Sequence, residues 1–225
     1  SNYFYIMETV FGYPVFTVNV SNAKFDRKKI IKQIEHNYKK DPTRDSFPFS
    51  NNHQEHKDRD NKNFKTIDYS SLLPIYNEAT KTFFESFKLN KPFDYSYTIE
   101  NYVATKRGQY MFQHVHPGCH FSAVHYLKFN PSIHPRTIFV NPNQVLPTYY
   151  SDYNPTFQKA VKPDTSVSFC MNHFSFDTIE DDITFFPNTL EHFVPLQRKK
   201  SNEMRITIVF NIYVKQKKED IKRGY

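Results

Sequence analysis

Apolar residues in the first part of the chain follow patterns typical of one strand and one helix. Residues 8–20 are rich in β-branched and aromatic side chains, which predicts a strand, or two strands broken near Pro14. Asn22 or Asp26 can cap a helix that runs from there to about Tyr38. The apolar stripe of this helix consists of Phe25, Ile30, Ile31 and Ile34.

The pattern then breaks and resumes. Residues 39–65 contain few apolar side chains, so they predict a long loop that is either mobile or draped over the domain, and that is a candidate lid over a substrate. Residues 71–89 predict a second helix, with Pro74 tolerated in its first turn. Its apolar side consists of Leu72, Leu73, Ile75, Tyr76, Ala79, Phe83, Phe84 and Phe87.

Beyond Pro92 the pattern changes to short strands separated by turn residues. The predicted strands are residues 94–106, 109–116, 121–128, 136–140, 183–186, 192–196 and 205–214. Two helices followed by many strands predict an α+β fold, in which N-terminal helices back a double-sheet jelly roll. Residues 141–172 show no clear pattern, and we expect them to cross near the open end of the sandwich.

Length and composition favour one domain. A chain of 225 residues can bury a sizeable core, and 23 Phe and 16 Tyr compensate for a hydrophobic content of only 38%. We therefore predict a single domain over residues 1–225. Within it, residues 1–92 form an N-terminal support, residues 93–214 the β core and residues 215–225 a basic tail.

Cysteine content and hydropathy bear on the compartment. Cys119 and Cys170 are better interpreted as free thiols in a reducing compartment than as a disulfide framework. No stretch has the length of a transmembrane helix, and the N-terminus lacks the features of a signal peptide. We therefore expect an intracellular, soluble and cytoplasmic protein.

The formal net charge of +7 does not by itself indicate nucleic-acid binding. Residues 215–225 carry five basic and two acidic side chains, a net +3, and the remaining charge is scattered among acids. There is no stripe of Lys and Arg interleaved with aromatic residues. The tail is expected to be a solvated end, and the oligomeric state is left open.

Histidines cluster in residues 113–126, QHVHPGCHFSAVHY. Residues two apart on a strand share a face, so His114 and His116 are expected to project to the same side and could offer two metal ligands. Solvated histidines on an edge strand are the alternative interpretation. His120, past the Pro117–Gly118 turn, and His125 are not expected to be ligands.

Two downstream segments strengthen the metal interpretation. His192 opens a short apolar strand, and Arg205 begins the strand that follows. In residues 205–214 one face is wholly apolar, while Arg205 and Thr207 lie on the other. If that face lines a cavity, Arg205 offers a fork of donors to a carboxylate, with the Thr207 hydroxyl beside it. A metal and a carboxylate anchor together suit a chelating 2-oxo-diacid.

These motifs resemble a branch of the 2-oxoglutarate/iron(II) oxygenase superfamily that is common in marine bacteria and phages. The resemblance is carried by H-x-H-P at residues 114–117, Ser122, the pair at 126–127, FFPNTLEHFV at 185–194 and RITIVFN at 205–211. It spans about half of the chain, and its downstream motifs are the more specific ones. Given the phage members of this branch, a viral origin is also open.

The resemblance implies a double-stranded β-helix (a cupin-like jelly roll) with iron(II) at one open end. It assigns His114 and His192 as metal ligands and Arg205 as the anchor of the far carboxylate of 2-oxoglutarate, with Thr207 beside it. Tyr126 could hydrogen-bond the cosubstrate. Two weaker candidates for the pocket lining are Asn101 and Asn211.

This chain departs from the family pattern, because His116 stands where the superfamily has Asp or Glu. We favour His116 as a third imidazole ligand, since imidazole is a competent iron ligand. Alternatively, the register shifts so that His116 is the first ligand and Gly118 takes the carboxylate position. That arrangement would leave a coordination site open for water or halide.

The resemblance implies a dioxygenase that uses dioxygen, with ascorbate as a candidate reductant, and releases succinate and CO2. A protein side chain such as prolyl is the favoured substrate, and a nucleobase or small metabolite is the alternative. Two other functions remain open. One is a cupin-like, three-histidine dioxygenase that does not use 2-oxoglutarate. The other is a non-catalytic β-sandwich module whose basic tail contacts an acidic partner.

Overall fold

The computed structural model describes residues 12–42, 51–54, 64–87, 89, 93–149, 155–160, 170–198 and 200–215. The helical elements are α1 (Arg27–Lys40), the short 3-10 helix η1 (Ser70–Leu72), α3 (Leu73–Glu85), α4 (Val145–Thr148) and α5 (Pro155–Ala160). The strands are β1 (Phe16–Asn19), β2 (Asn51–Gln54), β3 (Asp94–Thr105), β4 (Met111–His114), β5 (Phe121–Lys128), β6 (Ile138–Val140), β7 (His173–Phe174), β8 (Asp182–Pro187), β9 (His192–Val194) and β10 (Arg205–Lys215).

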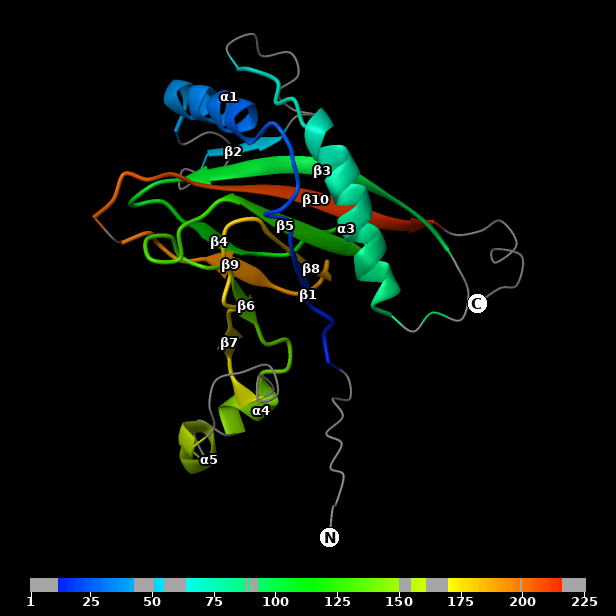
Figure 1. The fold of residues 1–225 in the computed structure, drawn as a ribbon. Coiled ribbons are helices and arrows are strands. Elements are labelled where there is room, and N and C mark those ends of the chain that lie inside the picture. Colours follow the sequence, from blue (N-terminus) through cyan, green and yellow to red (C-terminus); the bar gives the residue numbers. More distant parts are fainter. Residues whose placement is uncertain are drawn as a thin grey trace.

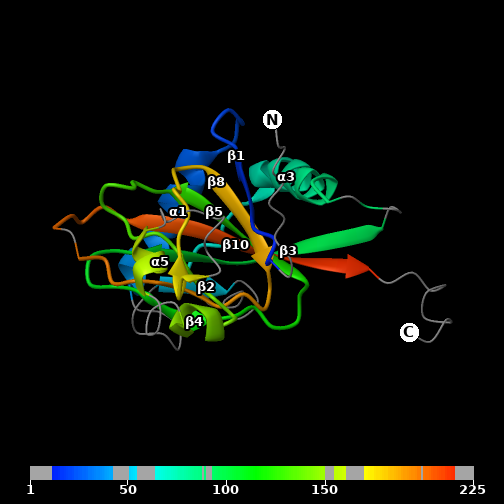
Figure 2. The same cartoon turned by 90° about the horizontal axis from the view of Figure 1, so that it is seen from below.

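The strands form two antiparallel sheets, as in a jelly roll (Figure 1). The larger sheet has the order β1-β8-β5-β10-β3-β2, and the smaller has the order β4-β9-β6-β7. β3 and β10 are the longest strands and pair up to Asp94 and Lys215, so they extend together beyond their neighbours (Figure 2). The α+β composition and the two-sheet architecture expected from the sequence are confirmed at this level.

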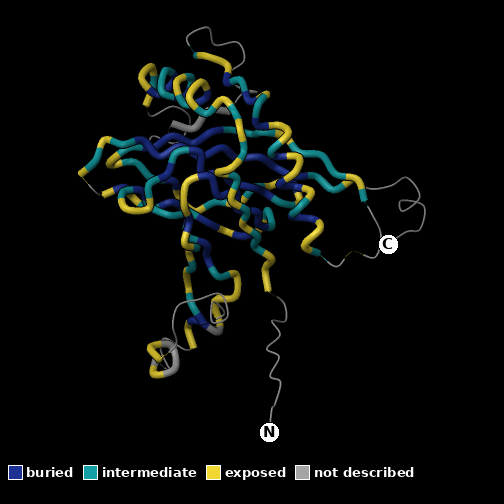
Figure 3. The backbone as a smooth tube through the Cα atoms, viewed as in Figure 1, coloured by how far each residue is buried: buried dark blue, intermediate teal, exposed yellow. Residues whose placement is uncertain are grey.

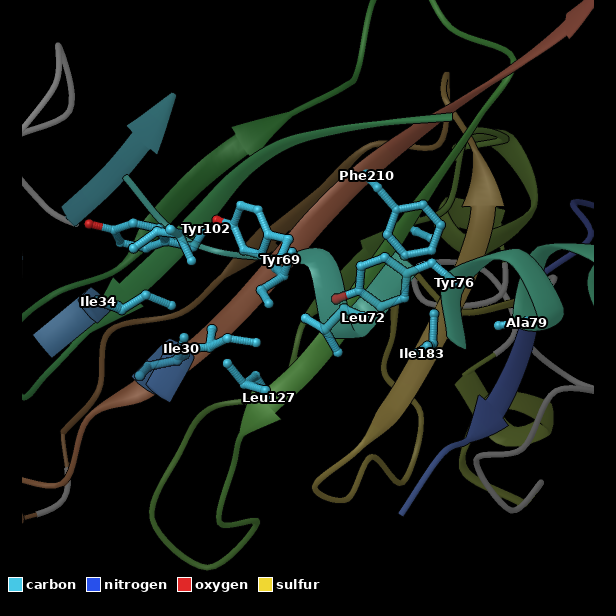
Figure 4. Packing of buried hydrophobic residues seen from close by; sticks show 14 of the residues in the cluster. Ile30, Ile34, Tyr69, Leu72, Tyr76, Ala79, Tyr102, Leu127, Ile183 and Phe210 are labelled. Carbon is cyan, nitrogen blue, oxygen red and sulfur yellow. The ribbon is translucent and has the colours of Figure 1, made fainter. Parts of the chain in front are cut away.

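Helices α1 and α3 cover one face of the larger sheet and bury an aromatic core against it (Figure 4). Tyr76 of α3 stacks on Phe210 of β10 with ring centroids 4.4 Å apart, and Phe83 stacks on Phe185 at 4.8 Å. Such ring pairs add to the free energy gained by burying their apolar area. The helix stripes predicted from the sequence are the faces that pack, except that Leu73, expected on the buried side, is 42% exposed at the start of α3.

Strand β10 separates two environments. Its residues Ile206, Ile208, Phe210 and Ile212 are fully buried in the core beneath the helices. Val209 instead packs in a second apolar cluster between the two sheets, with residues of β3, β5, β6, β8 and β9. The period-2 alternation predicted for this strand is confirmed, and it places Arg205 and Thr207 on the face that looks toward the smaller sheet.

Some predicted boundaries were wrong. The strand expected over residues 109–116 ends at His114, so His116 lies beyond the strand. Strand β2 falls in the stretch expected to be a loop, because pairing with β3 needs only its backbone groups. Residues 141–172 include the short helices α4 and α5, which project away from the sheets and carry exposed residues (Figures 1 and 3).

Several predictions fall on residues outside the described part of the chain. These are the strand before residue 12, most of the polar stretch 39–65 and the basic tail from residue 216. Within the described residues, no helix is long and apolar enough to cross a membrane. Cys119 and Cys170 are buried free thiols, as expected.

Candidate metal and cosubstrate site

Three histidines lie close together at strands β4 and β9 of the smaller sheet. His114 is the last residue of β4 and lies directly across from His192, the first residue of β9. His116 follows two residues later, and its backbone N–H donates to the Asn188 carbonyl at 3.0 Å. The nearest ligand atoms of the three rings all lie within 4.8 Å of one another. The structure thus gathers the three residues that the sequence analysis proposed as metal ligands.

Backbone carbonyls fix the orientation of two of the rings. The Nδ1 atoms of His114 and His192 lie 2.8 Å from the Phe112 carbonyl and 2.9 Å from the Leu190 carbonyl. A carbonyl can only accept, so Nδ1 carries the proton in each neutral ring and Nε2 keeps its lone pair. This is the arrangement that protein scaffolds use to present histidine to a metal.

The distance between two of the ring nitrogens also fits a metal. Nε2 of His116 and Nε2 of His192 face each other at 3.2 Å. With metal–nitrogen bonds of about 2.1 Å, two ligands at a right angle have nitrogens about 3 Å apart. At this distance the two nitrogens can share either a proton, if His116 carries one on Nε2, or a metal cation, if both are unprotonated.

Burial keeps the cluster neutral. It lowers the pKa of His116 to about 4 and that of His192 to about 3, and in both cases the neighbouring histidines lower the pKa further. The pKa of His114 is also lowered, again mainly by burial. Neutral imidazoles bind a metal without first losing a proton, so the site is competent at neutral pH.

The cluster contains no carboxylate among the residues that the structure describes. Three neutral imidazoles are a donor set that suits iron(II), as well as other first-row metals. The residues therefore fit a bound iron ion, but the site would carry one negative charge fewer than a site with an Asp or Glu ligand. The shifted register would leave His114 out of the ligand set, whereas the structure brings His114 into the cluster with His116 and His192.

A buried arginine lies between the sheets at the start of β10. Arg205 is only 1% exposed, and its guanidinium carbon lies 5.5 Å from the Tyr126 ring centroid and 5.9 Å from that of Phe129. Among the described residues, it forms one long hydrogen bond of 3.4 Å to the Thr137 hydroxyl, and its buried Nε has no partner. Burial lowers the pKa of Arg205, yet a guanidinium stays protonated in proteins.

No described carboxylate pairs with this cation. An unpaired buried charge is costly, so such a residue is normally neutralised by a partner. A carboxylate-bearing ligand between the sheets would supply that partner and the missing acceptors. Arg205 is therefore a candidate anion anchor, as the sequence suggested.

Other polar groups surround Arg205. The Tyr126 hydroxyl donates to the Thr137 hydroxyl at 2.8 Å, and Thr207 is buried on the same face of β10 as Arg205. Sequence reasoning missed Thr137, because a single Thr before a three-residue strand carries no distinctive pattern. The oxygen of Asn101, another predicted pocket residue, is buried on β3 without a partner.

Strand β6 connects the two ends of the site. Thr137 contacts Arg205 and Tyr126, while Phe139, two residues on, lies 5.9 Å from the His192 ring, centroid to centroid. Two residues on a strand span about 7 Å. Residues 137–139 therefore contact both the arginine end and the histidine cluster.

The remaining predicted residues lie elsewhere. Asn211, a predicted pocket residue, is buried on β10, and its Oδ1 accepts a hydrogen bond from the Ser122 hydroxyl at 2.7 Å. His125 is buried on the opposite face of the sheet, and His120 accepts a hydrogen bond from the Val214 backbone at 3.2 Å. Neither is part of the cluster.

Comparison with known proteins agrees with this geometry. Residues 102–211 match the family described as "Putative 2OG-Fe(II) oxygenase". This segment, just under half of the chain, is similar to the 2-oxoglutarate/iron(II) oxygenase superfamily. Iron(II) and 2-oxoglutarate are the metal and cosubstrate of this superfamily, and the three histidines could hold the metal. A search of curated proteins found no match.

Solved structures show more distant likenesses. An oxidoreductase of the 2OG-Fe(II) oxygenase family from Burkholderia pseudomallei is 13% identical, with 64% of this chain and 57% of that chain covered and a TM-score of 0.41. A viral collagen prolyl hydroxylase from Paramecium bursaria Chlorella virus-1 is 13% identical, with 88% and 94% covered and a TM-score of 0.47. A Pseudomonas putida prolyl-4-hydroxylase is 9% identical, with 91% and 94% covered and a TM-score of 0.48.

Proposed function

We propose that this protein is an iron(II)- and 2-oxoglutarate-dependent dioxygenase that hydroxylates a C–H group of its substrate and releases succinate and CO2. One observation carries the proposal. Three imidazoles lie close enough together to share a metal, and the buried Arg205 has no acidic partner among the described residues. We also assign the two sheets to a double-stranded β-helix, the fold that the superfamily uses.

Each residue has a defined task in this proposal. His114, His116 and His192 hold iron(II), which supplies the oxidising chemistry with dioxygen and 2-oxoglutarate when bound. Arg205 pairs with the far carboxylate of 2-oxoglutarate. The Thr207 and Thr137 hydroxyls offer further hydrogen bonds at this end of the site. Tyr126 supports this end by donating to Thr137. Asn101, whose buried oxygen lacks a partner, remains a candidate for lining the pocket.

The substrate proposal is a protein side chain, with prolyl favoured from the wider superfamily. Two exposed apolar residues beside the cluster are compatible with it. Phe112 is 40% exposed with its ring 5.9 Å from that of His114, and Val115 is 39% exposed. An apolar rim suits an uncharged aliphatic ring better than a charged metabolite. A nucleobase or an uncharged small metabolite is the alternative substrate.

A cupin-like dioxygenase that does not use 2-oxoglutarate is the second candidate function. The observation that favours it is the missing carboxylate, since the cluster is made of histidines alone. The two functions differ in what Arg205 does. If the protein uses no 2-oxoglutarate, Arg205→Ala leaves the metal chemistry largely intact.

The test is conversion of 2-oxoglutarate to succinate under air with iron(II) and ascorbate, with and without candidate substrates. We expect slow succinate formation alone and faster formation with a proline-containing peptide, accompanied by a 16-dalton mass increase of the peptide. A nucleoside and an uncharged metabolite serve as the alternative substrates. Absence of succinate under all conditions, with metal bound at one ion per chain, would favour the second candidate. Absence of stoichiometric metal would favour a non-catalytic binding module.

A further inference from the structure

The C-terminal part of β5 carries the aromatic rings that flank Arg205. Tyr126 lies within this strand, and Phe129 directly follows its last residue. The two ring centroids lie 5.5 and 5.9 Å from the guanidinium carbon of Arg205, and 5.2 Å from each other. The direction in which the guanidinium points therefore depends on where these two residues are held.

This part of β5 lacks regular strand pairing on either side among the described residues. On one side, the pairing of β5 with β8 ends at His125, opposite Ile183. On the other side, the register with β10 shifts between Ile206 and Ile208, opposite residues 126–127. A regular ladder thus does not hold the backbone that carries the Tyr126 ring.

The turn before β8 and the start of α1 supply backbone partners in its place. The Asp181 N–H donates to the Tyr126 carbonyl at 2.9 Å. Nη1 of Arg27, the first residue of α1, donates to the Leu127 carbonyl at 2.7 Å. Asp181 has a φ of 68°, a left-handed conformation that Asp adopts more readily than most residues. A turn and a helix residue therefore do here what a neighbouring strand does elsewhere.

Glu180 connects these groups to Phe129. Its Oε2 accepts the Phe129 N–H at 3.0 Å, and its Oε1 accepts a hydrogen bond from Arg27 Nη1 at 3.1 Å. Arg27 forms a second ion pair with the buried Asp181. Arg27, Glu180 and Asp181, called the Arg27 cluster below, thus bind the backbone of three residues at the end of β5.

We propose that the Arg27 cluster positions Tyr126 and Phe129, and through them keeps the Arg205 guanidinium in the orientation that binds the far carboxylate of 2-oxoglutarate. The inference rests on the anion anchor of the proposed function. The members of the cluster are positioning residues, because they act through the backbone of residues 126–129 from the helical side of the sheet.

The physical reason is that Arg205 has few bonds of its own to fix it. Among the described residues it forms one long hydrogen bond, and its Nε has no partner. A cation over an aromatic face is attracted only while the ring stays within about 6 Å. If Tyr126 and Phe129 shift, the guanidinium loses its fixed direction, and ligand binding must then supply the cost of ordering it.

The test is anaerobic titration of 2-oxoglutarate into the iron(II)-loaded protein, followed by the charge-transfer band, with iron affinity and urea unfolding measured for each variant. Glu180→Gln keeps the size of the side chain but leaves one acceptor oxygen for two donors. We expect it to weaken 2-oxoglutarate binding about 3–10-fold and to leave iron affinity unchanged. The sign is informative, because loss of a negative charge would by Coulomb's law alone strengthen the binding of a dianion.

Arg27 gives a second pair of variants. Arg27→Met removes the donor to the Leu127 carbonyl and both ion pairs, so it should weaken 2-oxoglutarate binding by a similar factor of about 3–10. Arg27→Lys keeps the charge but lacks the planar fork that reaches several acceptors at once, so its affinity should lie between those of Arg27→Met and the wild type.

The matched control is Glu35→Gln. Glu35 of α1 pairs with Lys128 of β5 at 3.1 Å, with side-chain exposures of 36% and 28%. The corresponding exposures are 47% for Glu180 and 27% for Arg27, so the two ion pairs are similarly exposed. Glu35 makes no described hydrogen bond to the backbone of residues 126–129. Its replacement should leave 2-oxoglutarate affinity within about twofold of wild type.

The outcomes separate the positioning role from the anchor itself. If the wild type binds 2-oxoglutarate and Glu180→Gln binds it equally or more tightly, the positioning role is wrong while the anchor stands. The role is also wrong if Glu35→Gln weakens binding as much, or if Glu180→Gln loses iron affinity by the same factor, since either result shows a general effect on the fold. If Glu180→Gln does not fold, Arg27→Lys is judged by the same criteria. If the wild type binds iron but no 2-oxoglutarate, the anchor of the proposed function fails.

Discussion

The two faces of the larger sheet bury histidine and arginine in opposite ways. On the helical side, His125 has both ring nitrogens engaged, one 2.9 Å from the Tyr76 hydroxyl and the other 3.3 Å from Asp181. Arg27 forms ion pairs with Asp181 and Glu180 and donates to the Leu127 carbonyl at 2.7 Å. This network links α1, α3, β5 and the turn before β8.

On the side of the smaller sheet the same residue types lack such partners. Nε2 of His116 and Nε2 of His192 face each other at 3.2 Å, and no carboxylate among the described residues pairs with the buried Arg205. Both regions combine buried with partly exposed members, since His125 and Arg205 are buried while Arg27 and His116 are only partly so, and burial alone does not distinguish them. Buried polar groups that lie together without hydrogen-bond partners indicate a binding site. Buried polar groups whose hydrogen bonds are all made within the protein indicate a structural role.

The largest expected effect comes from removing a ligand. His192→Ala should abolish iron(II) binding and succinate formation, because it deletes one of three protein ligands. His114→Ala and His116→Ala should do the same, as measured by anaerobic iron titration and metal analysis. Retention of iron by His114→Ala alone would move the site to the shifted register that begins at His116.

Arg205→Met should weaken the binding of 2-oxoglutarate without lowering the stability of the protein. Hydrogen bonds to a charged group contribute about 1.5–3 kcal/mol, so the KM for 2-oxoglutarate should rise about 10–150-fold. Removing an unpaired buried cation should leave the free energy of unfolding of the ligand-free protein unchanged or raise it. Urea unfolding measures the second effect, and a clear loss of stability would show that Arg205 already has a partner in the protein.

His125→Leu should have the opposite effect, a loss of stability without a change in metal binding. It leaves the buried Tyr76 hydroxyl without its partner and weakens the contact with Asp181, so it should cost about 1–3 kcal/mol of unfolding free energy. Iron affinity should not change, because His125 lies on the helical face. Weakened metal binding at unchanged stability would contradict the division between the two faces.

The smallest effect is on the pH dependence of stability. Burial lowers the pKa of His114, His116, His125 and His192 in the folded protein. The unfolded chain therefore takes up protons below about pH 6.5, where the folded protein does not. Stability is fully present above this pH and falls as the pH drops toward about 4 and 3, the pKa values of His116 and His192. Thermal melts of metal-free protein from pH 8 to 4 should show this loss, and a flat profile would contradict it.

Much of the fold could be predicted from the sequence, because its signals are local. The alternation of apolar and polar residues in β10 assigns Ile206 and Ile208 to one face of the strand and Arg205 and Thr207 to the other. The apolar stripes of α1 and α3 were found in the same way. Strand β2 was missed because its polar residues are held by backbone pairing with β3, which leaves no hydrophobic pattern.

The site was predicted less completely, since its details depend on contacts between distant strands. Thr137 lies 68 residues from Arg205 in sequence, and Asn211 lies 89 residues from Ser122. No local pattern links such pairs. The pairing of β10 with β5 and the end of β4 before His116 become visible only in the structure.

The most direct test of the central claim is anaerobic titration of 2-oxoglutarate into iron(II)-loaded protein, monitored by the metal-to-ligand charge-transfer band in the visible spectrum. We predict a band that saturates at one 2-oxoglutarate per chain in the wild type and needs about 10–150 times more 2-oxoglutarate in Arg205→Met. A protein that binds one iron ion but gives no band at any concentration of 2-oxoglutarate would contradict the account.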